Sequence, residues 1–208
     1  MLQIFYQDKP IIITDSISED NTVSNIKFKD FKLKSALKNL SKKKKSSIRL
    51  IANDKKKALK KFLKLLPNIK AGGGKVINSK GEILFIFRNN KWDLPKGKAE
   101  NNENIADTAI REVKEETGIE DLTITKPLQI TYHIFKKNDS YRLKITYWFE
   151  MKSLVENKLI PQLEEGITRA EWINPSEIEK IKKKCYANIR LLISQILAQV
   201  WYSHLYWQ

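Results

Sequence analysis

The segment from Gly97 to Ile119 restricts the fold of this chain more than any other, because its apolar residues recur at helical spacing. This spacing predicts an amphipathic helix over residues 104–117 with one buried apolar stripe: Ile105, Ala106, Ala109, Ile110 and Val113. Asn104 is a suitable N-cap for this helix, and Gly118 stands where a left-handed C-cap is needed. The segment therefore predicts a helix that packs its apolar stripe against a core.

Three glutamates of this helix, Glu112, Glu115 and Glu116, lie three and four residues apart, so their carboxylates project from one face. Like charges gathered in one place repel, which costs stability unless a cation lies among them. Carboxylate oxygens suit a hard divalent ion, Mg2+ or Mn2+, which also binds substrate phosphates. Arg111 is placed to pair with Glu103 or with one of the three carboxylates and to fix its rotamer. The helix alone also fits a second interpretation, an ordinary solvated face of charged residues.

The spacing of nine residues in this segment resembles the Nudix box, which reads Gly, five residues, Glu, seven residues, Arg-Glu, an apolar residue, any residue, Glu-Glu, any residue, Gly and an apolar residue. The matching residues are Gly97, Glu103, Arg111, Glu112, Val113, Glu115, Glu116, Gly118 and Ile119. The Trp-x-x-Pro-x-Gly run that ends at Gly97 also resembles this family. The resemblance covers roughly residues 70–185. It implies the Nudix α/β/α sandwich around a mixed sheet, and a hydrolase that cleaves a nucleoside diphosphate linked to another group.

The resemblance also implies roles for individual residues. Glu112, Glu115 and Glu116 would hold Mg2+ or Mn2+, together with the backbone carbonyl of Gly97. Arg111, Glu115 and Glu116 are the catalytic candidates within the box, whereas Glu103 and Gly118 are structural positions. A carboxylate must take a proton from the attacking water. The general base is therefore Glu115, or one of the two acids Glu164 and Glu165 in a later loop.

Candidate substrate contacts lie around this segment. Arg88, Lys96 and Lys98 are candidates for contacting phosphate, although a solvated basic residue is an equal alternative at each position. Tyr132 and Tyr147 are candidates for stacking on a base, the alternative being ordinary packing in a sheet. The Leu-Pro-Lys-Gly-Lys lead-in and the KITYWF strand favour a nucleoside polyphosphate, either a dinucleoside polyphosphate or a nucleoside triphosphate. ADP-ribose, a diphosphoinositol phosphate and capped RNA remain alternatives, as does a Nudix protein that senses nucleotides or binds nucleic acid.

The positive charge of the chain is concentrated in its first third. Residues 1–70 contain 18 Lys and Arg against 6 Asp and Glu, whereas residues 71–208 contain 21 against 18. Either this region binds a polyanion such as nucleic acid, or lysine simply fills its solvated positions. The pattern divides the chain into a small basic α/β region, residues 1–69, and a Nudix domain with a C-terminal helical region, residues 70–208.

The expected elements follow from local patterns. Residues 1–15 predict a hairpin, residues 16–25 a loop and residues 47–52 a strand. Residues 26–40 do not separate strand from helix, although residues 35–40 (SALKNL) favour a helix. Asp54 begins a helix that runs to residue 66. Strands are expected at residues 82–88, at residues 128–135 and 141–151 as a hairpin, and within residues 163–173. Ser176 and Glu179 are spaced as a capping box at the start of the last helical region, which is expected to break near residues 184–186.

The remaining composition predicts a protein of the cytoplasm. Cys185 is the single cysteine, which fits a reducing compartment, and neither a signal peptide nor a membrane span is evident. The aromatic end of the chain, residues 201–207, is expected to pack on the protein itself or on a second copy, which would make a homodimer.

Overall fold

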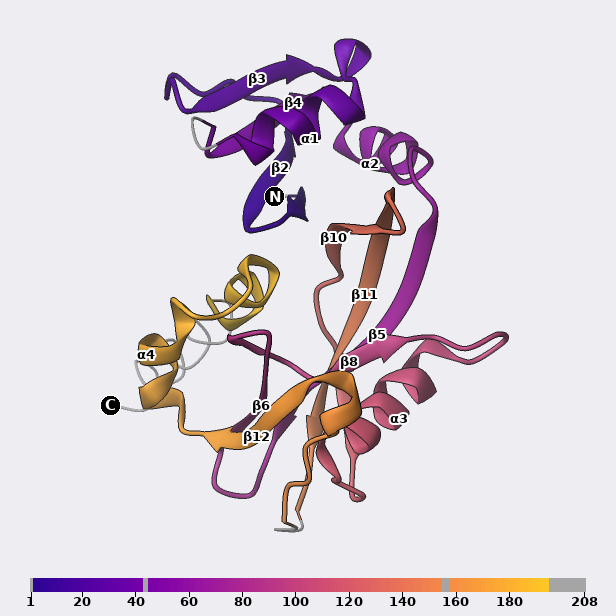
Figure 1. Cartoon of the computed structure of the whole chain (residues 1–208), viewed down its shortest axis with the longest axis vertical. Helices are drawn as coiled ribbons and strands as arrows, with labels where there is room; N and C mark the ends of the chain where they lie inside the picture. The colour runs from indigo at the N-terminus through magenta and orange to yellow at the C-terminus, as the bar shows by residue number, and fades with distance from the viewer. Residues whose placement is uncertain (1, 43–44, 155–157, 195–208) are drawn as a thin grey trace. The chain divides into compact units, whose positions relative to one another are not determined.

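The computed structural model describes residues 2–42, 45–154 and 158–194 and divides the chain into two compact units (Figure 1). Unit 1 contains Met1–Ile69 and Thr131–Ile145, and unit 2 contains Lys70–Ile130 and Thr146–Gln208. The sequence places one boundary at residue 69. Unit 1 as observed also takes in a later hairpin, so the chain leaves unit 2 and enters it again.

Unit 1 is built on a mixed sheet with the strand order β11-β10-β1-β2-β4-β3. Its strands are β1 (Leu2–Tyr6), β2 (Lys9–Thr14), β3 (Val23–Lys27), β4 (Ser47–Ile51), β10 (Thr131–Lys137) and β11 (Ser140–Lys152). β1 and β2 pair antiparallel, which confirms the hairpin predicted for residues 1–15. β4 runs parallel to β2 and β3, and β1 runs parallel to β10. The loop predicted for residues 16–25 is wrong at its end, because β3 begins at Val23.

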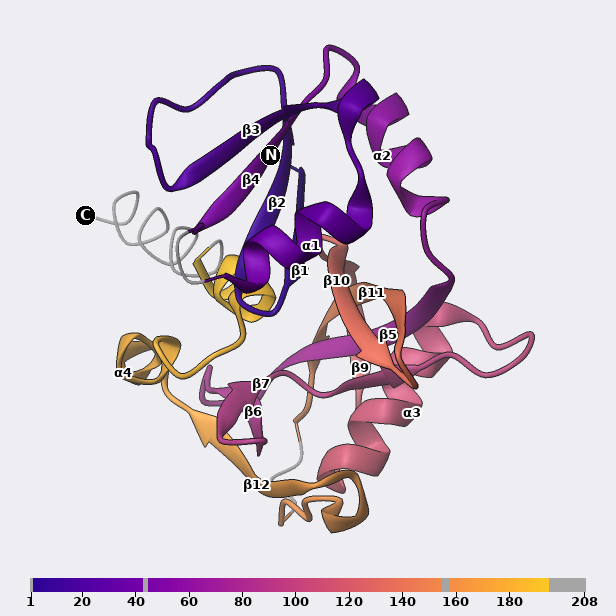
Figure 2. The same ribbon diagram turned by 45° about the horizontal axis from the view of Figure 1, so that its top comes forward.

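Two helices cover the sheet of unit 1. α1 (Leu33–Ser41) packs on β4, and α2 (Lys55–Leu63) packs on β2. Figure 2 shows α1 lying over the strands. The Asp54 side chain caps α2 as predicted, accepting a hydrogen bond of 2.9 Å from the Lys57 backbone N–H. Residues 26–40, which the sequence left open, contain the end of β3, a 3-10 turn and most of α1. Fully buried Leu37, Leu40 and Phe62 anchor the helices.

The strands of unit 2 pair in the order β12-β6-β5-β11. Its further strands are β5 (Asn68–Ile77), β6 (Ile83–Arg88), β7 (Lys91–Asp93), β8 (Lys96–Lys98), β9 (Thr123–Pro127) and β12 (Ile167–Ile173). β7 pairs with β6, β8 with β5 and β9 with β11. The helices are α3 (Ile105–Thr117) and α4 (Ile178–Lys182), and residues 187–194 are also helical. Within the described residues no helix has both the length and the hydropathy that crossing a bilayer requires.

The sheet of unit 2 separates two apolar cores. Successive residues of a strand point to opposite faces, and Leu84 and Phe85 of β6 accordingly enter different clusters. Leu84 packs with Val113 of α3, whereas Phe85 packs with Ile178 of α4 and with the helical residues after it. Figure 1 shows α3 and α4 on opposite sides of the strands. Unit 2 is therefore an α/β/α sandwich around a sheet, and the predicted fold class is confirmed.

The C-terminal part of the chain corrects one expectation. The capping box at Ser176 is wrong, because Asn174 accepts the Ser176 N–H at 3.0 Å and opens a 3-10 turn, Pro175–Glu177, before α4. The predicted break is confirmed: α4 ends at Lys182, and Cys185 then forms a β-bridge with Trp92. Residues 201–207, together with Ile196 and Val200 of the expected apolar stripe, lie outside the described residues.

Candidate active site

Helix α3 has the ends that its sequence specifies. The Asn104 side chain accepts the Ala106 N–H at 2.9 Å, and Gly118 takes a left-handed conformation with φ of 75° and bonds back to the Lys114 carbonyl. Ala109 and Val113 are fully buried in the apolar core on this side of the sheet. The prediction for residues 104–117 is confirmed, and the caps and the stripe together fix which face of α3 is turned outward.

Gly72 of β5 lets the backbone of α3 approach the sheet closely. A Cβ atom at this position would lie 2.7 Å from both the Ala109 nitrogen and the Ile105 oxygen. Both are backbone atoms, which cannot rotate away. Gly72 pairs with Gly97 of β8, so the same stretch of β5 brings β8 next to the helix.

Two of the three box carboxylates meet β8. Glu116 Oε2 accepts the Lys96 backbone N–H at 2.9 Å, and a Cβ atom at Gly97 would overlap the Glu112 carboxylate. The side chains of Glu112 and Glu116 are only 14% and 3% exposed. Glu112, Glu116 and the backbone of Gly97 therefore converge on one buried spot between α3 and β8.

The two buried carboxylates lack enough positive charge around them. Burial raises the pKa of Glu116 to about 7, with Asp93 adding to the effect and Lys96 and Arg88 opposing it. Burial also raises the pKa of Glu112, although Arg111 opposes this shift. A raised carboxyl pKa means that the ionised form is destabilised where it stands. A cation at this spot would reverse that cost.

Arg111 holds the remaining acids of the box in place. It binds Glu103 with two hydrogen bonds, from Nε at 2.8 Å and from Nη2 at 3.0 Å. Its Nη1 lies 2.9 Å from both Glu112 and Glu115. Glu103 also accepts the Glu100 N–H and the Thr108 hydroxyl. Glu103 therefore fixes the guanidinium of Arg111, and its assignment as a structural position stays a prediction.

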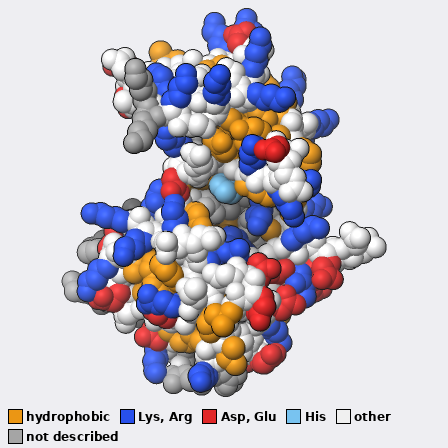
Figure 3. Space-filling model, in the orientation of Figure 1, with side chains coloured by type: hydrophobic (Ala, Val, Ile, Leu, Met, Phe, Trp, Pro, Cys, Tyr) orange, Lys and Arg blue, Asp and Glu red, His pale blue; other side chains and the backbone are white. Residues whose placement is uncertain are grey.

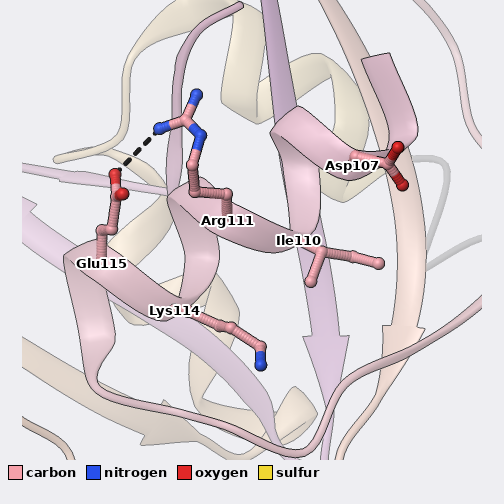
Figure 4. Close-up of a pocket in the computed structure, with 5 residues that line it drawn as sticks. All are labelled: Asp107, Ile110, Arg111, Lys114 and Glu115. Carbon is pink, nitrogen blue, oxygen red and sulfur yellow. Dashed lines mark hydrogen bonds and ion pairs between the residues drawn. The ribbon is translucent and has the colours of Figure 1, made fainter. Parts of the chain in front are cut away.

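Glu115 is the most exposed of the three box carboxylates, although Arg111 Nη1 links it to Glu112. Its side chain is 48% exposed and turned toward Arg111 along the outer face of α3 (Figure 4). Asp107, Ile110 and Lys114 complete a shallow surface pocket of about 360 Å³ on this face. The described residues contain no cluster of three His, Cys, Asp or Glu side chains in a metal-binding arrangement. Arg111 holds Glu115 next to Glu112, while the Lys96 N–H of β8 holds Glu116.

The donor set nevertheless fits a hard divalent cation. Every candidate ligand is an oxygen: the carboxylates of Glu112, Glu115 and Glu116 and the carbonyl of Gly97. The pKa values of Glu112 and Glu116 are raised by burial, so both carboxylates would gain from such an ion. Rotation of Glu115 away from Arg111 about its own side-chain bonds would add the third carboxylate.

Of the two candidate loop bases, Arg88 contacts one. Its Nη1 lies 3.6 Å from Glu116 and its Nη2 lies 3.7 Å from Glu165. Glu165 stands in the 3-10 turn Leu163–Glu165 before β12 and is close enough to raise the pKa of Glu112. Glu164 in the same turn is exposed and makes no ion pair with any described residue. Of the two loop acids, the structure brings only Glu165 to the site.

Lys96 has a buried partner that residue spacing does not predict. Its Nζ lies 2.5 Å from Asp93, which is 4% exposed and also accepts the Leu94 N–H. In the sequence Asp93 is a single acidic residue of the lead-in, and its position directly after Trp92 is the one local signal that marks it. The Lys96 ammonium is thus engaged inside the protein, whereas the Lys98 side chain is exposed.

The two candidate stacking residues belong to different units. Tyr132 lies on β10 in unit 1, opposite Ile4 of β1, and Tyr147 lies on the part of β11 in unit 2. Both are half-buried. Their suggested role in binding a base stays a prediction.

Replacing Glu103 with Gln is expected to destabilise the protein at neutral pH by about 2 kcal/mol, because it removes a charged bidentate partner of Arg111. The hydrogen bonds from Arg111 lower the pKa of Glu103 to about 2. The stabilisation is therefore present above pH 4.5 and disappears as the pH falls through 4.5 towards 2. The free energies of unfolding of the unchanged protein and of Glu103→Gln are measured in urea at pH 7 and at pH 3. A difference between them that does not shrink at pH 3 would contradict the assignment.

This chain is similar in sequence to one protein-family model and to several known proteins. The model of the NUDIX domain matches residues 69–192, which is more than half of the chain. The mRNA-decapping enzyme subunit 2 of Saccharomyces cerevisiae (strain YJM789) is 27% identical over 151 residues, covering 71% of this chain and 15% of the yeast protein. The RNA pyrophosphohydrolase of Bartonella bacilliformis is 26% identical over 157 residues, covering 61% of this chain and 91% of that protein. The chain thus spans only a small part of the yeast relative.

Solved structures of similar chains include an Ap4A hydrolase from C. elegans, with a TM-score of 0.46 and 22% identity over 64% of this chain and 97% of that one. A MutT protein from Methanosarcina mazei Go1 gives a TM-score of 0.46 and 25% identity over 62% of this chain and 93% of that one. The extent of the domain match, with the box intact on α3, decides the family. This chain belongs to the Nudix hydrolase family.

Proposed function

We propose that this protein is a metal-dependent pyrophosphohydrolase that cleaves a phosphoric anhydride bond in a nucleoside polyphosphate. The observation that carries the proposal is the convergence of Glu112 and Glu116 on Gly97, where both carboxylates are buried with raised pKa values. Such a site is unfavourable for the protein alone and suited to a divalent cation, Mg2+ or Mn2+. The chemistry that this ion supplies is neutralisation of phosphate oxygens and acidification of the attacking water.

The protein's own residues have separate tasks in this proposal. Glu112, Glu115 and Glu116 are the ligands, with the Gly97 carbonyl as a fourth oxygen. Arg111 orients Glu112 and Glu115 through its hydrogen bonds, and it is itself fixed by Glu103. Reaction at a pyrophosphate depends on such orientation, because the attacking water must stand in line with the bond that breaks.

Glu165 is the general base that the geometry favours over Glu164. Its link to Glu116 through Arg88 holds it beside the buried carboxylates, while its 57% exposed side chain keeps access to water. Glu115 is the other candidate, but one of its oxygens accepts a hydrogen bond of 2.9 Å from Arg111, whereas Arg88 lies 3.7 Å from Glu165. We expect Arg88 to serve the substrate too, because its guanidinium lies between two acids and can turn to a phosphate.

The preferred substrate is a dinucleoside polyphosphate or a nucleoside triphosphate. A second candidate, the polyphosphate end of an RNA, is favoured by the sequence relatives, whose names state action on mRNA and on RNA. The excess of Lys and Arg in residues 1–70 would suit the RNA strand. The salt dependence of binding distinguishes the two candidate substrates. Binding of an RNA through many phosphates weakens steeply as the salt concentration rises, whereas binding of a small nucleotide should weaken much less.

The test is a panel of substrates incubated with purified protein and Mg2+ or Mn2+. The panel holds diadenosine polyphosphates, nucleoside triphosphates, ADP-ribose, a diphosphoinositol phosphate, and RNA with a capped or triphosphate 5′ end. We expect phosphate or nucleotide release from one polyphosphate class, lost when EDTA is added. Folded protein that releases nothing from the whole panel would contradict the proposal.

A further inference from the structure

Unit 1 contains a cavity of about 660 Å³ that is formed entirely by its own residues. Three segments far apart in the sequence line it: Lys32–Lys34 at the start of α1, Leu65–Pro67 after α2, and Asp139–Tyr141 at the start of β11. A volume of this size is typical of small-molecule sites, which span roughly 300–1,000 Å³. The box residues of α3 belong to unit 2, so the hydrolytic site has no part in this cavity.

Most of the cavity wall is apolar. The apolar lining residues are Leu33, Leu65, Leu66, Pro67 and Tyr141. Leu65 is 46% exposed, so its side chain is accessible from the cavity. The ring of Tyr141 is held by Tyr6 in an edge-on contact with 5.8 Å between the ring centroids. A fixed aromatic ring near an exposed leucine offers a wall against which a flat, apolar group can stack.

The rim of the cavity is positively charged. Lys32 and Lys34 are exposed, and neither forms an ion pair with a described residue. The first turn of α1 contains no acidic residue, and a positive charge there is unfavourable for the helix. These lysines therefore do not serve the stability of α1. The one acidic lining residue, Asp139, is bound by Lys136 at 2.6 Å. On the face drawn in Figure 3, Lys and Arg side chains spread over unit 1 with apolar side chains among them.

We propose that this cavity binds a nucleotide, with its base against Leu65 and Tyr141 and its phosphate between Lys32 and Lys34. A nucleotide matches both halves of the site, because it joins a flat stacking surface to an anion. The nucleotide is either a free one or a residue of an RNA strand. This binding does not depend on the proposed hydrolysis, since none of its contacts involves the Nudix box.

Equilibrium binding to the full chain tests the proposal. The probes are AMP and a fluorescent oligoribonucleotide with a 5′-hydroxyl end, both in EDTA so that no cation draws phosphate to the box. The double variant Lys32→Gln, Lys34→Gln is expected to bind about tenfold more weakly than the unchanged protein. The matched control is Lys56→Gln, Lys57→Gln, at two exposed positions at the start of α2 outside the cavity, and its binding is expected to stay within about twofold.

A second variant tests the apolar wall. Tyr141→Leu keeps an apolar side chain but removes the ring, so it is expected to weaken binding without removing the charge. Saturable binding of AMP identifies a free nucleotide as the ligand, whereas binding of the oligoribonucleotide alone identifies an RNA strand. Equal loss in both lysine pairs would show general attraction to a basic surface and overturn the proposal, as would absence of saturable binding. Turnover of the panel substrate, measured in parallel, reports on the hydrolytic site separately.

Discussion

Replacing Glu116 with Gln is expected to lower turnover by about a hundredfold or more while the fold stays intact. Gln keeps the volume of Glu and can still accept the hydrogen bond that the Lys96 N–H donates at 2.9 Å. It removes the negative charge from the most deeply buried of the three proposed ligands. The measurement is the rate of product release on the best panel substrate, over a range of Mg2+ concentrations.

The stability of the same variant provides the control for folding. Burial raises the pKa of Glu116 to about 7, above its usual value of 4.5, so the folded metal-free protein holds this proton more tightly than the unfolded chain. Stability should therefore fall as the pH rises from 4.5 through 7. Gln lacks this ionisation, so Glu116→Gln is expected to be at least as stable as the unchanged protein at pH 8 in EDTA. A variant that is active and less stable would contradict both the role and the environment assigned to Glu116.

Substitutions at two glycines are expected to have different effects, one mainly on stability and the other mainly on activity. Gly72→Ala should destabilise the protein by about 3 kcal/mol, because the added methyl group meets the backbone of α3 at 2.7 Å and neither side can move away. Gly97→Ala should cost much less stability, since the atoms nearest to its methyl group belong to the end of the Glu112 side chain, which can rotate. The rotated carboxylate would leave the proposed site, so turnover should fall by about tenfold or more.

Thermal unfolding and turnover of both glycine variants are measured side by side. Gly72→Ala is expected to lose activity only in proportion to the unfolded fraction, and lowering the temperature should restore it. Gly97→Ala is expected to stay folded and poorly active at every temperature. If Gly97→Ala instead kept near-normal turnover, Glu112 and the Gly97 carbonyl could not both be ligands as proposed.

The sequence predicted α3 well because several kinds of information agree along it. The apolar stripe, the Asn104 cap and the Gly118 cap each indicate the same helix. The structure confirms both caps and buries Ala109 and Val113 of the stripe, whereas its other residues, Ile105, Ala106 and Ile110, are half-buried. β3 and β9 escaped prediction for a physical reason. β3 lies at the edge of its sheet and most of β9 is exposed, so neither strand needs a clear alternation of apolar and polar residues.

The electrostatic detail of the site could not be predicted from spacing. Helical periodicity places Glu112 and Glu116 on one face, but it does not show that β8 covers them or that Glu115 stays outside with Arg111. Arg88 contacts both Glu116 of α3 and Glu165 of the turn before β12, and Lys96 pairs with Asp93 of β7. Spacing along one helix carries no information on such contacts, which depend on the register of β5 with β8 and on the path of the chain into β12.

Binding of Mn2+ to the full chain, followed by electron paramagnetic resonance with a non-hydrolysable nucleotide present, tests the central claim most directly. The protein is expected to bind the ion, and Glu112→Gln and Glu116→Gln are each expected to weaken binding by about tenfold or more. Glu164→Gln is the matched control, because this exposed acid makes no ion pair with a described residue, and it should leave binding unchanged. Equal Mn2+ affinity in all four proteins would contradict the account.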